Sequence, residues 1–158
     1  MGRDLRRIGD LGTPGSPSPF RSRVEIEVRY AETDQMGVVH HSVYLVWFEQ
    51  ARTRLCLETG YHYAAIEELG FYLVVTQAEA RLIRGATYGE TVGVSCWLDR
   101  LQSRGLRFAY EVDRDGEKLA RGATEHIWVE RASGKPCRIP PILKDPFEKL
   151  RSGAATSA

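Results

Sequence analysis

A short segment holds most of the residues that could do chemistry. Residues 31–41 place Glu32, Asp34, His40 and His41 within a few positions of one another. Carboxylates and imidazoles transfer protons, and a carboxylate can also attack a carbonyl carbon. Loops held by rigid elements often carry such groups, and the segment has no strand or helix periodicity. It is therefore our candidate functional loop.

The chain directly after this loop predicts a helix N-terminus. Ser42 is a suitable N-cap and Gly60 a suitable stop, so we expect a helix from about Ser42 to Thr59. Free N–H groups at residues 41–44 and the positive end of the helix dipole would stabilise an oxyanion. With a carboxylate nearby, this arrangement indicates acyl transfer. From spacing alone a structural role stays open, because Asp34 can cap a turn and the histidines can bond to backbone.

Period-two patterns predict the strands that position this loop. Val24, Ile26 and Val28 alternate with charged residues, which indicates a strand over 23–30 with one buried face. After the helix we expect strands over 71–84, 90–101, 104–113 and 117–131, joined by tight turns. We expect six residues of the first of these strands to share one face: Tyr72, Val74, Thr76, Ala78, Ala80 and Leu82. A short helix is expected over 140–150.

The predicted long helix is apolar on nearly every side. An apolar stripe at helical spacing begins at Tyr44. The first two turns of the helix also contain Val43, Leu45, Val46 and Trp47, so we expect the sheet to wrap the helix. A small sheet around one helix leaves an unpaired edge, which a second copy can cover. We therefore expect a homodimer, with a tetramer as a dimer of dimers.

Length and composition indicate one globular domain. The chain has 158 residues, of which 42% are hydrophobic. We expect a flexible leader over 1–22, which is rich in turn-forming residues, one domain over 23–151 and a frayed tail over 152–158.

The net charge is +1, and most of the excess arginine lies before residue 24, so the rest of the chain is slightly acidic. Nucleic acid is therefore not the expected partner.

Other features limit the compartment and the chemistry. The chain has no apolar stretch long enough to cross a membrane and no signal peptide, so we expect a cytoplasmic protein with no membrane partner. Cys56, Cys96 and Cys137 are odd in number and widely spaced, which predicts reduced thiols. We expect no metal, because adjacent histidines such as His40 and His41 seldom converge on one ion.

Common catalytic motifs are missing. The sequence contains neither a phosphate-binding GxxxxGK[ST] nor a zinc-binding HExxH. Gly93-Val94-Ser95 begins like a nucleophile elbow, but Trp97 stands where GxSxG requires glycine. His62 and His126 are expected to be structural.

Residues 28–41, followed by Tyr44-Leu45 and Phe48–Thr53, carry a family resemblance. They are similar to the signature of the 4-hydroxybenzoyl-CoA thioesterase family, in its YbgC-like branch, and the similarity continues over roughly 23–140. The resemblance implies the α+β hotdog fold, whose β-α-β-β-β-β order matches the one predicted above. It also implies an acyl-CoA thioesterase with the active site between subunits. Two departures are His40, where tyrosine is frequent, and Gln50, where arginine is frequent.

The resemblance assigns roles to individual residues. Asp34 is the catalytic carboxylate, either as nucleophile or as general base for water, and the backbone N–H of His41 polarises the thioester carbonyl. The His41 imidazole is then available to steady the thiolate or orient Asp34. The residues that we expect to bind substrate are Thr33, Gly37, Val38, His40, Tyr44 and Arg84.

Coenzyme A is part of the substrate in this reading, and no bound cofactor is implied. The candidate cations for its phosphates are Arg81, Arg84, Arg104, Arg107 and Arg138, and the apolar tunnel would involve Tyr44 and Phe48. Two alternatives stay open. One is a hotdog dehydratase using His41 with Glu49, although the His-Phe-Pro pattern is absent; the other is a non-catalytic acyl-CoA-binding protein.

Overall fold

The computed structural model describes residues 17–154. It contains five strands, three α-helices and one 3₁₀ helix. Their bounds are β1 Arg21–Glu27, η1 Tyr30–Glu32, α1 Val43–Leu57, α2 Tyr63–Glu68, β2 Phe71–Leu82, β3 Thr91–Leu101, β4 Gly105–Arg114, β5 Glu117–Glu130 and α3 Pro141–Ser152.

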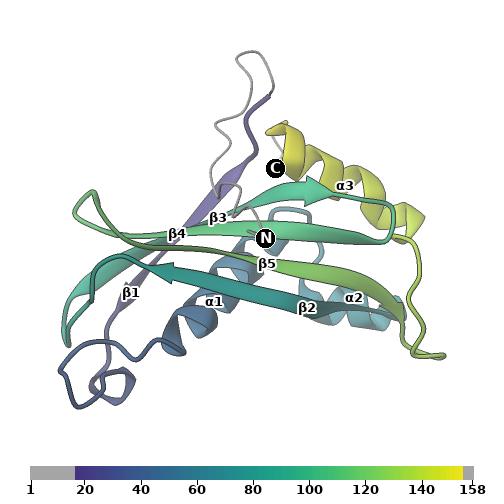
Figure 1. Cartoon of the computed structure of the whole chain (residues 1–158). Helices are drawn as coiled ribbons and strands as arrows, with labels where there is room; N and C mark the ends of the chain where they lie inside the picture. The colour runs from purple at the N-terminus through teal and green to yellow at the C-terminus, as the bar shows by residue number, and fades with distance from the viewer. Residues whose placement is uncertain (1–16, 155–158) are drawn as a thin grey trace, which may run out of the picture.

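The strands form one antiparallel sheet in the order β1-β3-β4-β5-β2, and helix α1 lies across its inner face (Figure 1). Helix α1 packs chiefly against β1 and β3 and touches β2 only slightly. This is the α+β hotdog arrangement that the sequence predicts. Strand β2 is left at one edge of the sheet, with α1 displaced away from it.

The core lies between α1 and the inner face of the sheet. The Phe48 ring of α1 stacks on Tyr110 of β4 with centroids 4.3 Å apart and an interplanar angle of 10°. Gly122 of β5, directly opposite Tyr110, makes room for this pair, because a Cβ there would collide with Phe48 and with the Glu79 carbonyl. One helix can therefore sit close to the strands at this point.

Both chain ends of the described segment pack at one corner of the fold. The Phe20 N–H donates to the Leu150 carbonyl of α3 at 2.8 Å, and β1 begins at Arg21, two residues before the predicted start. Residues 20–22 therefore belong to the folded body and not to the leader that we expected to end at residue 22. Residues 1–16 and 155–158 of the expected leader and tail lie outside the described residues.

The prediction that one face of β2 runs from Tyr72 to Leu82 is wrong. A bulge interrupts the pairing with β5 between Val75 and Gln77. Tyr72 and Val74 therefore lie on the outer face of the sheet, while Ala78, Ala80 and Leu82 lie on the inner face with Val75. The alternating sequence pattern cannot reveal this change, because the inserted residue reverses the side of every later one.

In the single chain the sheet covers only part of the surface of α1. Leu45 is 40% and Val46 is 57% exposed. Val75, Ala78, Ala80 and Leu82 are exposed on the inner face of the neighbouring edge strand. We call these six residues the open strip: Leu45, Val46, Val75, Ala78, Ala80 and Leu82. The single chain thus leaves an apolar surface uncovered beside its longest helix.

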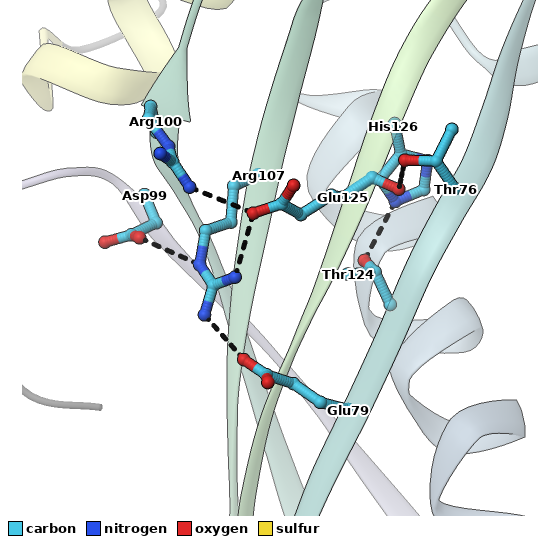
Figure 2. Close-up of polar contacts among 8 residues, drawn as sticks. All are labelled: Thr76, Glu79, Asp99, Arg100, Arg107, Thr124, Glu125 and His126. Carbon is cyan, nitrogen blue, oxygen red and sulfur yellow. Dashed lines mark hydrogen bonds and ion pairs between the residues drawn. The ribbon is translucent and has the colours of Figure 1, made fainter. Parts of the chain in front are cut away.

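The outer face of the sheet carries a charge network centred on Arg107 of β4 (Figure 2). Its guanidinium forms ion pairs with Glu79 of β2 at 2.8 Å, Glu125 of β5 at 3.2 Å and Asp99 of β3 at 3.4 Å. Arg100 also pairs with Glu125, at 3.0 Å. Arg107 therefore links three neighbouring strands across one face.

Other expectations can be compared directly. Helix α2 was not predicted, whereas the predicted C-terminal helix is present as α3. Cys56, Cys96 and Cys137 are free thiols. Among the described helices, none has the length and apolar character needed to span a bilayer.

Candidate active site

The candidate loop is a tight hairpin between β1 and α1, at the end of the molecule where β2 finishes (Figure 1). The Asp34 N–H donates to the Val38 carbonyl at 2.9 Å, and the His40 N–H donates to the Glu32 carbonyl at 2.9 Å. Gly37 turns the chain with a φ of 79°, which glycine adopts without strain. The loop thus brings Asp34 and the residues before α1 onto two adjoining arms.

The Asp34 side chain is held by its own turn. Its Oδ1 accepts the Met36 N–H at 2.8 Å, and the Asp34 carbonyl accepts the Gly37 N–H at 2.9 Å. Within the described residues, Oδ2 makes no hydrogen bond. One carboxylate oxygen is therefore fixed by the backbone, and the other is available to a water or a substrate.

The start of α1 does not follow the predicted cap. The Ser42 hydroxyl caps no N–H of the helix and instead lies 2.7 Å from Nδ1 of His40. The same His40 nitrogen accepts the Ser42 N–H at 3.2 Å, so the His40 ring is bonded to both the backbone and the side chain of Ser42. The His40 and His41 rings lie against each other with centroids 4.0 Å apart.

The backbone N–H of His41 is unused by the described part of the chain. No described residue accepts a hydrogen bond from it, whereas the neighbouring Ser42 and Val43 N–H groups both bond to His40. This N–H beside the N-terminus of α1 can donate a hydrogen bond to a carbonyl oxygen. It is the N–H to which the sequence analysis assigns the thioester oxygen, and that role stays a prediction.

A second segment runs along the loop. Val38 pairs with Thr87 as a β-bridge, and the Val39 N–H donates to the Ala86 carbonyl at 2.9 Å. Gly85 faces the Val38 side chain so closely that a Cβ there would lie 2.9 Å from its Cγ1. Thr33, Gly37, Val38 and His40 are thus brought together with the segment that carries Arg84.

Tyr44 and Phe48, expected to contact substrate or its tunnel, are fully buried in the single chain. Tyr44 packs edge-on against Trp47 with centroids 5.1 Å apart. Burial raises the pKa of the Tyr44 hydroxyl, against a smaller opposing effect of the Ala86 backbone. In the first turn of α1 the exposed apolar residues are Leu45 and Val46, and periodicity alone could not separate them from the core positions.

The candidate arginines are distributed over the whole molecule. Arg84 pairs with Glu117 at 2.9 Å, and Arg107 is held by three carboxylates. Arg104 and Arg138 lie at the opposite end of the sheet, because the Ile139 N–H bonds to Ser103 in the β3–β4 turn. Arg81 lies on β2 near the loop and makes no ion pair within the described residues.

A large hollow on the described surface lies away from this loop. A hollow of about 750 Å³ lies between α3 and the end of β3, lined by charged side chains that include Arg100, Lys144 and Asp145. The loop adjoins the beginning of β3, where Val28 bonds to Glu90. No set of three described residues is arranged to hold a metal ion.

Comparison with known proteins identifies the family. The model of the thioesterase-like superfamily matches residues 28–147. The chain belongs to the thioesterase-like superfamily. This confirms the resemblance found in the sequence and places the Asp34 loop inside the matched region.

Individual members of this superfamily are similar over most of the chain. A putative acyl-CoA thioesterase, YneP, from Bacillus subtilis is 36% identical over 78% of this chain and 91% of that protein. The crystal structure of a DHNA-CoA thioesterase from Staphylococcus aureus is 33% identical, covers 84% of this chain and 91% of its own, and has a TM-score of 0.79. A Thermus thermophilus thioesterase complexed with coenzyme A and Zn is 28% identical, over 85% of this chain and 96% of its own, with a TM-score of 0.72.

Proposed function

We propose that this protein is an acyl-CoA thioesterase, which hydrolyses the thioester of a small or medium acyl-CoA to a free acid and coenzyme A. The observation that carries the proposal is that one loop at the N-terminus of α1 holds both an Asp34 Oδ2 and a His41 N–H that make no hydrogen bond within the described residues. The names of its relatives within the thioesterase-like superfamily support the same reaction.

In the proposed reaction the His41 N–H receives the thioester oxygen as negative charge develops on it. Asp34 either removes a proton from the attacking water or attacks the carbonyl carbon itself, giving an anhydride that water then opens. In both routes the C–S bond breaks and the thiolate leaves without a strong general acid, because thiols have a pKa of about 8.5. No metal or bound cofactor is used.

We propose that the active form is a homodimer, on which a tetramer can be built. The open strip lies on the edge strand β2 and beside α1, where a second copy would cover it and complete an acyl-binding surface. Arg84 and Arg81 are the cations that we assign to the phosphates of coenzyme A, because they lie on the segment next to the loop. The free thiols fit a reducing compartment.

The test is release of free thiol from a panel of acyl-CoAs. Asp34→Asn should lower kcat/KM by about 100- to 10,000-fold, whereas the same change at exposed Asp145 on α3 should leave it unchanged. A parent protein that binds acyl-CoA without releasing thiol would favour the non-catalytic alternative. An Asp34→Asn variant as fast as the parent would remove Asp34 from the mechanism.

The dimer is tested separately. Val46→Glu places a charge in the open strip and should give a monomer by light scattering that has lost hydrolysis. A fully active monomer would show that one chain carries the whole site.

A further inference from the structure

Glu32 is a buried carboxylate that lies two residues before Asp34. The residue is 6% exposed, and both of its carboxylate oxygens are occupied. Oε2 accepts the Arg29 N–H at 2.8 Å, while Oε1 accepts from the Arg29 guanidinium at 3.0 Å and from the Trp47 indole N–H at 3.3 Å. The Glu32 side chain therefore joins the end of β1 to helix α1.

The backbone of the same residue joins the other arm of the loop. Its carbonyl accepts the His40 N–H at 2.9 Å, and its N–H donates to the Arg29 carbonyl at 3.0 Å. His40 directly precedes His41, whose N–H we assign to the thioester oxygen. Glu32 is thus bonded to the helix through Trp47 and to the oxyanion donor through His40, while Asp34 follows it along the chain.

The carboxylate is held in its ionised form. Burial acts to raise the pKa of Glu32, but the hydrogen bonds from Arg29 and Trp47 outweigh it and keep the pKa below its usual range. Three hydrogen bonds already engage its two oxygens, and the residue is 6% exposed, so the Glu32 carboxylate is directed into the fold and not at a substrate. We therefore assign Glu32 no direct role in proton transfer or nucleophilic attack.

We propose that Glu32 is a positioning residue, which sets the distance between the Asp34 carboxylate and the His41 N–H by bonding the loop to the Trp47 indole. This inference rests on the proposed function. Catalysis that depends on two groups facing one carbonyl is sensitive to small displacements, and a shift of about 1 Å can cost about 100-fold in rate. The core packing of Trp47 does not depend on its N–H.

Two substitutions remove the Glu32–Trp47 hydrogen bond, one from each partner. Glu32→Gln replaces one carboxylate oxygen by an NH₂ group, which must then face either the Arg29 N–H or the Trp47 indole N–H, both of which are donors. Trp47→Phe removes the indole N–H and keeps an aromatic ring. The matched control is Glu27→Gln, the same change at an exposed position of β1.

The experiment combines steady-state kinetics with hydrogen exchange of the full chain. Glu32→Gln and Trp47→Phe should each lower kcat by about 10- to 100-fold with little change in KM, and the double variant should lose no more than the worse single one. Backbone amides of residues 33–42 should exchange faster in both variants, while those of β3 and β4 keep the parent rates. Glu27→Gln should match the parent in both measurements.

The outcomes are distinguishable. Parent kcat and parent exchange in Glu32→Gln would overturn the proposal, and so would faster exchange throughout the sheet, which would mark a general loss of stability. If the parent itself released no thiol, the proposed function would fail, and the exchange of residues 33–42 would still decide whether Glu32 positions the loop.

Discussion

His126 should make the stability of this protein fall between pH 7 and pH 5. Its imidazole is buried on the inner face of β5, with Nε2 2.8 Å from the Thr124 hydroxyl, which in turn lies 2.6 Å from the Tyr110 hydroxyl (Figure 2 shows His126 and Thr124). Burial and the charge of Arg52 lower the pKa of His126 from 6.5 to about 4, against a smaller opposing effect of the Leu73 backbone. His126 therefore binds a proton less readily in the folded protein than in the unfolded chain.

The size of the effect follows from these two pKa values. The folded pKa lies below the unfolded one, so the unfolded chain binds more protons between pH 6.5 and pH 4 and stability falls as the pH falls through that window. From pH 7 to pH 5 the free energy of unfolding should drop by about 2 kcal/mol from this group alone. Carboxylates with lowered pKa values, such as Glu32 and Asp113, contribute to such a drop only at lower pH.

Urea denaturation at pH 7 and pH 5, at one fixed protein concentration, measures this difference. His126→Gln removes the titrating group. Between pH 7 and pH 5 the free energy of unfolding of this variant should therefore drop by about 2 kcal/mol less than that of the parent, whatever the stability of the variant at pH 7. The control is His62→Gln, because His62 is exposed and caps α2. An equal drop in parent and His126→Gln would refute the reasoning.

Two further substitutions test the packing of the sheet. Gly122→Ala should destabilise the fold by about 1–3 kcal/mol in urea, since the new methyl group meets Phe48 and the backbone of Glu79; unchanged stability would mean that α1 can move off the sheet at no cost. Arg107→Met should lower the melting temperature because it leaves three carboxylates close together, and added salt should recover part of the loss. A loss that salt does not change would show that packing and not charge is responsible.

The elements with clear periodicity could be predicted from the sequence. In the sequences of β3 and β4, the residues that are buried alternate with less buried ones without interruption through the middle of each strand. Both strands therefore lie within one residue of the expected bounds. Helix α1 was predicted from its cap region and its glycine stop, although Ser42 does not cap it with its side chain. The loop was predicted as the site because its residue types are unusual for a connection of that length.

What could not be predicted depends on contacts between distant residues. The β2 bulge follows from pairing with β5, and six-residue α2 is too short to show a helical period. Glu32 looked like one more loop acid, because its importance comes from the Trp47 indole 15 residues later. The exposure of Leu45 and Val46 likewise depends on where α1 crosses the sheet, and this crossing position cannot be predicted from a single sequence.

The packing of Phe20 against Leu150 has a practical consequence for handling the protein. Both ends of the described chain leave the fold at the corner where β1 begins and α3 ends, and the Asp34 loop follows the opposite end of β1. A tag, a fluorophore or a surface attachment placed at either end of the described segment therefore starts at the opposite end of β1 from the loop. The same proximity would allow a short linker to join the two ends in a circularly permuted chain.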